Sequence, residues 1–184
     1  MTKRIPKRAS QGEAKPEDQP FILTALLPPE LQAQANALRQ AHFPPERNFL
    51  DAHVTMFHAL PRFCESELTS LLGQVARECA PLRGRLEGLM SLGGGTALKL
   101  HSPDLLDLRA HIADHFHGLL TAQDQHTPRL HVTVQNKVSS AKAKALQAEL
   151  EAVISPRAIH FPGLALHIYR GGPWEFVRDW KFRG

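Results

Sequence analysis

The sequence contains little cysteine and no long hydrophobic run, and both absences narrow the class of protein. Its two cysteines, Cys64 and Cys79, fit neither a disulfide framework nor a CxxC metal site. No apolar run approaches the roughly 18 residues of a membrane span. The N-terminus also lacks the hydrophobic segment of a signal peptide. We therefore expect a cytoplasmic protein with reduced thiols and no membrane contact.

The composition is that of a folded protein with a small excess of positive charge. Hydrophobic residues make up 42% of the 184 residues and charged residues 22%, which supports a sizeable core and argues against global disorder. The net charge of +4 weakly favours an anionic partner. Residues 1–20 are basic, polar and rich in proline, so we expect a disordered N-terminal arm followed by one folded domain over residues 21–184.

Hydrophobic periodicity predicts strands and helices that alternate along this domain. The predicted helices cover residues 29–43, 65–80, 102–120 and 140–154. The predicted strands cover residues 21–28, 51–60, 82–92, 96–101, 129–138, 158–170 and 173–182. The order β-α-β-α-β-β-α-β-α-β-β places a similar series of elements in each half of the chain. This order predicts an α+β fold with a duplicated β-α-β-α-β-β architecture.

The tripeptide His-Val-Thr occupies the same place in both halves, at residues 53–55 and 131–133. Side chains alternate along a strand, so each copy puts its histidine and threonine on one face and its valine on the other. If the two strands face each other, two imidazoles and two hydroxyls meet in a cleft. A neutral imidazole can remove a proton from an attacking water, while an imidazolium protonates the leaving oxygen. Hydroxyl groups can hold the phosphate oxygens, so the pair suits phosphodiester chemistry without a metal or other cofactor.

The two tetrapeptides "HVTM" and "HVTV" resemble the paired motifs of the 2H phosphoesterase superfamily, and in particular of bacterial 2′-5′ RNA ligase-like proteins. The resemblance covers about residues 20–182. It implies a bilobed α+β fold in which two mainly antiparallel sheets face a central cleft. The implied activity is the hydrolysis of 2′,3′-cyclic phosphate ends of RNA or nucleotides to 2′-phosphates, and some members also join RNA reversibly through 2′-5′ bonds. The implied protein is a monomer.

The same resemblance gives the motif residues their roles. His53 and His131 would be the catalytic acid–base pair, and Thr55 and Thr133 would bind the phosphate. For opening a cyclic phosphate, the resemblance favours His131 as the base that activates water. In relatives a proline commonly precedes the second motif directly, whereas here Pro128 is separated from it by two residues, so the loop that leads into this motif departs from the family pattern.

Four further residues are candidate substrate contacts, each with a structural alternative. Phe57 either stacks on a base or forms part of the core, and Lys137 either meets phosphate or lies at an exposed strand end. Arg178, among the aromatic residues of the last strand, either binds phosphate or stacks on an aromatic ring. Tyr169 would line the rim of the site.

Other histidines fit structural roles better. His58 faces away from His53 along the strand, and we expect it to have a structural partner. His111 and His115, with Asp107 a turn earlier, have a spacing that can bind zinc, but a further ligand and a glutamate between the histidines are absent. Two other functions therefore remain open: a non-catalytic module that binds RNA ends, and a metal-dependent hydrolase that uses this helix.

Overall fold

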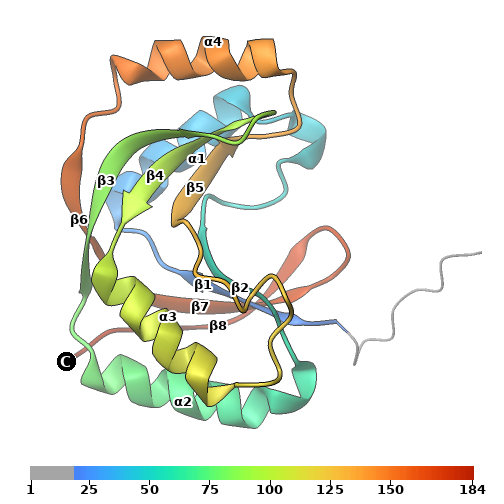
Figure 1. Ribbon diagram of the computed structural model, residues 1–184, viewed down its shortest axis with the longest axis vertical. Helices are drawn as coiled ribbons and strands as arrows, with labels where there is room; N and C mark the ends of the chain where they lie inside the picture. The colour runs from blue at the N-terminus through green and yellow to red at the C-terminus, as the bar shows by residue number, and fades with distance from the viewer. Residues whose placement is uncertain (1–18) are drawn as a thin grey trace, which may run out of the picture.

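The computed structural model describes residues 19–184, in which eight strands form two four-stranded sheets (Figure 1). Most of the basic arm expected over residues 1–20 lies outside these described residues. The helices are α1 (Pro29–His42), α2 (Glu65–Glu78), α3 (Pro103–His115) and α4 (Ser140–Glu151), with 3-10 turns at Pro45–Arg47 and Arg62–Cys64. Within the described range, no helix has the length and apolar character needed to cross a membrane.

The first sheet combines strands from both ends of the described chain. In spatial order its strands are β2 (Val54–Leu60), β1 (Phe21–Ala25), β7 (Gly163–Tyr169) and β8 (Trp174–Lys181). All neighbours are antiparallel. The central strand β1 is buried along its whole length, which explains why its sequence FILTA is a continuous run with four apolar residues rather than an alternating pattern.

The second sheet repeats this plan with the middle of the chain. Its strands, in spatial order, are β5 (His131–Gln135), β4 (Thr96–His101), β3 (Leu82–Ser91) and β6 (Arg157–Phe161), again all antiparallel. The units β1–α1–β2 and β4–α3–β5 correspond: in each, a helix connects an inner strand to the edge strand that carries a motif. The predicted α+β fold with two antiparallel sheets is confirmed.

The prediction of one strand over residues 158–170 is wrong, because Pro162 divides it into β6 and β7. Proline has no N–H group for a strand ladder, so pairing is interrupted there. β6 pairs with β3, whereas β7 pairs with β1 in the other sheet. β7 begins at Gly163, where a Cβ atom would lie 2.1 Å from the carbonyl oxygen of Trp180. The chain therefore crosses between the sheets at Pro162, and glycine permits the close approach of β7 to β8.

The helices cover the sheets in ways that the hydrophobic patterns mostly predict. α2 packs against β7 and β8, α4 packs against β3 and β4, and α1 packs against β5 of the second sheet (Figure 1). The Ser102 hydroxyl caps α3 by accepting a hydrogen bond from the N–H of Leu105 at 3.0 Å. α3 ends at His115, earlier than predicted, and Gly118 follows with a φ of 82° that favours glycine.

Candidate active site

The two motif histidines have the same local geometry. Each lies where an edge strand begins, His53 just before β2 and His131 at the first residue of β5. In both, Nδ1 lies 2.7 Å from the carbonyl oxygen two residues earlier, that of Asp51 or Arg129. A carbonyl can only accept, so Nδ1–H is the donor and the neutral ring keeps its lone pair on Nε2. Both imidazoles are therefore oriented with Nε2 available for proton transfer.

The strands that carry the histidines lie against each other. β2 and β5 are edge strands of different sheets and are in contact (Figure 1). Val54 and Val132 are completely buried and anchor the two strands, while Thr55 and Thr133 remain partly exposed. This is the alternation expected for His-Val-Thr on a strand with one buried face. The duplicated tripeptide thus places equivalent side chains at the junction of the two sheets.

A β-bulge follows the first motif and ends this alternation. Thr24 pairs with Thr55, but the next residue of β1, Leu23, pairs with Phe57, so Met56 is the extra residue in β2. Because of this bulge, Phe57 turns to the face opposite Thr55 and is completely buried. The interpretation of Phe57 as a residue that stacks on a base is therefore wrong, and its alternative role in the core is correct.

The second motif is followed by the same irregularity. Ala97 pairs with Thr133 and its neighbour Thr96 pairs with Gln135, which leaves Val134 as the extra residue of β5. Regular alternation would put Gln135 on the face of His131, but it is buried, and its Oε1 accepts a hydrogen bond from the Thr96 hydroxyl at 3.5 Å. Both motifs therefore consist of a short regular stretch, His-Val-Thr, that a bulge closes.

A pocket of about 560 Å³ opens beside His53. Among the described residues that line it, His53 is the one member of the two motifs. Its walls come from β1, α1, the segment of residues 48–52 and the β7–β8 hairpin. The Trp174 ring lies 4.5 Å from the His53 ring, and two exposed aromatic side chains, Phe49 (64%) and Phe176 (60%), line the same pocket. The pocket offers flat apolar surfaces next to an oriented imidazole.

The surroundings of His53 keep its ring neutral at physiological pH. Its pKa is lowered to about 4, chiefly by burial, although the hydrogen bond to the Asp51 carbonyl acts in the opposite direction. The positive charge of Arg39 and the neighbouring rings of His167 and His131 make smaller contributions to the same lowering. Burial also lowers the pKa of His167, whose Nε2 lies 3.4 Å from the Thr24 hydroxyl.

Comparison with known protein families agrees with this geometry. The family model described as the 2′-5′ RNA ligase superfamily matches residues 27–173, which include both motifs. The chain belongs to the 2′-5′ RNA ligase superfamily. The resemblance of its two motifs to the 2H phosphoesterases is thereby confirmed. A search of curated protein sequences gives no match.

Solved structures with the fold of this superfamily member cover nearly the whole chain at low sequence identity. The protein TT0787 from Thermus thermophilus has a TM-score of 0.60 at 15% identity, over 90% of this chain and 98% of that one. A phosphoesterase has a TM-score of 0.60 at 18% identity, over 91% and 100%. Escherichia coli LigT complexed with 3′-AMP has a TM-score of 0.56 at 16% identity, over 91% and 100%. These likenesses establish the fold.

The other predicted substrate contacts of this superfamily member lie outside the pocket beside His53. Lys137 follows the end of β5 in an exposed bend with a φ of 59°, which fits its alternative role as an exposed strand end. Tyr169 is 40% exposed at the end of β7, where it pairs with Trp174 across the hairpin. Tyr169 therefore neighbours the pocket without lining it.

Arg178 lies on the wrong side of the sheet for the cleft. His167 pairs with Phe176 but Leu166 pairs with Arg178, so Val177 is the extra residue of a third bulge. The aromatic face predicted for β8 is therefore divided: Phe176 lines the pocket beside His53, and Arg178 lines a separate hollow beside α2. The Arg178 guanidinium lies 5.4 Å from the ring of Trp180. This position fits its alternative role as a stacking partner of an aromatic ring.

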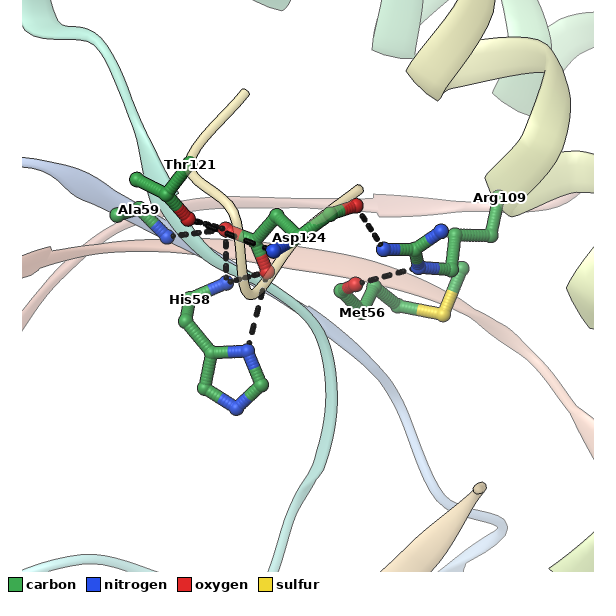
Figure 2. Close-up of polar contacts among 6 residues, drawn as sticks. All are labelled: Met56, His58, Ala59, Arg109, Thr121 and Asp124. Atoms are coloured by element: carbon green, nitrogen blue, oxygen red, sulfur yellow. Dashed lines mark hydrogen bonds and ion pairs between the residues drawn. The ribbon is translucent and has the colours of Figure 1, made fainter. Parts of the chain in front are cut away.

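His58 has a structural partner, as expected. Its Nδ1 lies 3.1 Å from Oδ1 of Asp124, a carboxylate that is 1% exposed (Figure 2). Asp124 also accepts hydrogen bonds from the backbone N–H groups of His58 and Ala59, both at 2.9 Å. Burial alone would raise the pKa of Asp124, but these hydrogen bonds outweigh it and hold the pKa below its usual range.

The histidine-rich helix α3 shows no arrangement typical of a metal site. Nε2 of His115 lies 2.8 Å from a carboxylate oxygen of Glu67 in α2, with which it can form an ion pair. Over residues 19–184, no group of three or more histidine, cysteine or acidic side chains is placed to hold a metal ion. This arrangement gives the metal-dependent alternative no structural support within the described chain.

Several residues of the site were assigned no role from the sequence, among them Arg39, His167 and Trp174. Arg39 appears in the sequence as an ordinary polar residue of an amphipathic helix, and His167 as one polar residue in an apolar strand. The aromatic pattern of the last strand includes Trp174, but only the pairing of β8 with β7 brings it to His53. No local signal marks these three residues, because their proximity arises from contacts between distant segments.

Proposed function

We propose that this protein is a metal-independent phosphodiesterase that opens 2′,3′-cyclic phosphates, at RNA ends or in nucleotides, to 2′-phosphates. The observation that carries the proposal is the matched geometry of His53 and His131, two imidazoles anchored at Nδ1 on edge strands that touch each other. One neutral imidazole and one imidazolium suffice for general base and general acid catalysis of this reaction. Reversible 2′-5′ joining of RNA would be the same chemistry run in reverse.

The hydroxyls of Thr55 and Thr133 serve as the phosphate ligands in this proposal. Each lies two residues after a histidine and shares its partial exposure. Hydroxyl donors that contact the two non-bridging oxygens would hold the phosphorus in line with the attacking water. The buried valines between them fix the strands, so the donors need little reorganisation during the reaction.

The position of the pocket supports distinct roles for the two histidines. A nucleoside that fills the pocket beside His53 places its ribose oxygens on that side of the phosphorus. Attack in line with the leaving 3′-oxygen then comes from the side of His131. His131 takes a proton from water as the P–O bond forms, and His53 gives a proton to the 3′-oxygen as its bond to phosphorus breaks. The aromatic rings of Trp174, Phe49 and Phe176 offer surfaces on which the base can stack.

The acid role of His53 requires that the substrate changes its protonation. In the free protein its pKa of about 4 keeps the ring neutral near pH 7. A bound phosphodiester brings a negative charge beside the ring, and an opposite charge favours the protonated form. We therefore expect His53 to take up its proton together with the substrate, and the pH–rate profile to be bell-shaped.

The test is incubation with 2′,3′-cyclic AMP and with a short RNA that ends in a 2′,3′-cyclic phosphate, in the presence of EDTA. We expect a 2′-phosphate product, and we expect His53→Ala and His131→Ala each to reduce turnover by at least about 10³-fold with the fold intact, since both proton transfers are needed. His58→Ala is the matched control, because this strand histidine pairs with Asp124 away from the dyad.

The outcomes separate the proposal from its alternatives. Full activity in either His53→Ala or His131→Ala would contradict the proposal that the two histidines act as an acid–base pair. RNA binding that falls with salt, without any product, would favour a module that only binds RNA ends. Loss of activity in EDTA that added zinc restores would favour a metal-dependent hydrolase.

A further inference from the structure

Two buried arginines connect each motif strand to the opposite half of the duplicated fold. Arg39 of α1 and Arg109 of α3 are each 5% exposed, and both point their guanidinium groups at backbone carbonyl oxygens. α1 and α3 are the corresponding helices of the two halves, because each follows an inner strand along the chain and precedes a motif strand. Arginines are rarely buried without partners, so their contacts indicate a specific role.

Arg39 belongs to the first half but binds the second motif. Its Nη1 donates a hydrogen bond to the carbonyl oxygen of Thr133 at 2.9 Å. Its Nε donates to the carbonyl oxygen of Leu50 at 3.1 Å, three residues before His53. One rigid guanidinium thus bridges the backbone of both motif regions. Its positive charge also acts on the ring of His53 and lowers its pKa.

Arg109 makes the reciprocal connection from the second half to the first motif. Its Nε donates to the carbonyl oxygen of Met56 at 3.0 Å, and its Nη2 donates to the carbonyl oxygen of Asp124 (Figure 2). Met56 is the bulge residue that follows Thr55 in β2. Further along the same strand, the backbone N–H groups of His58 and Ala59 donate hydrogen bonds to the carboxylate of Asp124 (Figure 2).

Two of the contacted carbonyl groups, those of Thr133 and Met56, belong to edge strands, which leave backbone groups on their outer side without a partner in their own sheet. Buried backbone groups need partners, and here the opposite half of the molecule supplies them. A planar guanidinium with donors in fixed directions determines the position of two acceptors at once. The two arginines therefore connect the sheets at the residues that flank the histidine pair.

We propose that Arg39 and Arg109 are reciprocal positioning residues that set the separation of the His53 and His131 imidazoles by fastening each motif strand to the opposite half of the fold. For its kinetic readout this inference rests on the proposed function. Neither arginine donates a proton in this role; Arg39 also lines the pocket beside His53, whereas Arg109 does not. A displacement of about 1 Å between reacting groups can reduce turnover on the order of 100-fold, so loss of either contact affects kcat more than KM.

The experiment compares Arg39→Lys, Arg109→Lys and the double variant with wild type, using 2′,3′-cyclic AMP and EDTA. Lysine keeps the charge but lacks the planar fork that reaches two carbonyls. We expect kcat to fall about 10- to 100-fold in each single variant, with KM changed less than about threefold. Because both contacts hold one geometry, the double variant should lose little more than the worse single variant. Arg77→Lys, on the exposed face of α2, is the matched control with wild-type kinetics.

Ring NMR signals of the histidines supply a readout that a merely structural role would not move. Arg39→Lys should shift the Nδ1–H signal of His131, whose strand it holds, and Arg109→Lys should shift that of His53, while the melting temperature stays above the assay temperature. If a buried ammonium prevents folding, the neutral variants Arg39→Gln and Arg109→Gln replace the lysine variants.

Three results would overturn the inference: wild-type kcat in a folded lysine or glutamine variant, a lower kcat with unchanged histidine signals, or fully additive losses that follow the melting temperature. If wild type does not turn over 2′,3′-cyclic AMP, the proposed function fails instead. The histidine signals then still decide whether each arginine positions the opposite motif.

Discussion

At the scale of single residues, the two motif histidines share their local geometry, but His53 has surroundings that its tripeptide does not determine. The letters His-Val-Thr determine the local geometry in both copies, including the anchored Nδ1 and the buried valine. The sequence therefore predicted the alternation of His, Val and Thr correctly, whereas the anchored Nδ1 became visible only in the structure. The environment of His53 comes instead from Arg39, His167 and Trp174, which distant segments bring together. Their effect on the His53 pKa was beyond prediction, because burial depends on the complete fold.

The lowered pKa of His53 makes the folded protein sensitive to mild acid. A histidine that titrates near 6.5 when unfolded and at about 4 when folded binds protons preferentially in the unfolded state between these values. Stability is therefore lost as pH falls from about 6.5 to about 4. We expect His53→Gln to remove this loss, so that between pH 7 and pH 4.5 wild type loses about 1–2 kcal/mol more unfolding free energy than the variant.

Urea unfolding at pH 7, 5.5 and 4.5 measures this difference. His160→Gln is the control, because it makes the same substitution at a histidine that is exposed on β6. Equal losses in wild type and His53→Gln would contradict the lowered pKa.

At the scale of secondary-structure elements, β-bulges account for most errors in predicting which side chains face the site. Strict alternation correctly relates His53 to Thr55, but bulges at Met56, Val134 and Val177 reverse the facing of the residues that directly follow them. A bulge residue here is an ordinary apolar strand residue, so the sequence carries no mark of it. Phe57 and Arg178 were misplaced for this one reason.

The contact of β7 with β8 depends on the absence of a side chain at Gly163. We expect Gly163→Ala to lower the unfolding free energy by roughly 3 kcal/mol or more, because a Cβ there would lie 2.1 Å from the Trp180 carbonyl oxygen and force the strands apart. Thermal unfolding followed by circular dichroism measures the effect.

Gly172→Ala is the matched control, since a Cβ at Gly172 has no neighbour within 4 Å among the described residues. A melting temperature for Gly163→Ala close to that of the control would show that the strands separate easily, contrary to this expectation.

At the scale of the whole molecule, polar contacts between the two halves stabilise the junction of the sheets. Asp124 follows α3 in the second half and binds β2 of the first. Asp124→Asn keeps the size of the side chain but removes its negative charge. It also replaces one of the two carboxylate oxygens that accept hydrogen bonds from the N–H groups of His58 and Ala59. We expect a loss of roughly 2–4 kcal/mol at pH 7, measured by urea unfolding.

The lowered pKa of Asp124 sets the pH range of this effect. The carboxylate stabilises the fold above its ordinary pKa, and this stabilisation is lost as pH falls through the lower folded value. The difference between wild type and Asp124→Asn should therefore shrink in strong acid. Asp107→Asn, on the exposed face of α3, is the control, and an equal cost for both substitutions would argue against a specific junction.

The duplicated plan of the molecule was visible in the sequence, but its connectivity was not. Periodicity and the repeated motif predicted the elements and the α+β fold. Partner choice between sheets depends on Pro162, where one apparent strand divides. A proline in the sequence predicts that a strand is interrupted. The residues around Pro162 do not show that the strand after it pairs with β1 rather than with β3.

This crossing gives the two sheets different folding requirements. All strands of the second sheet lie in one uninterrupted stretch, residues 82–161, whereas the first sheet joins β1 and β2 to strands that follow this stretch. Closing so long a loop costs more chain entropy, and pairing of distant segments is slow. During synthesis the strand after His53 is therefore made early, but its sheet waits for β7. The junction that brings His53 and His131 together would therefore assemble late in a newly made chain, after β7 is available.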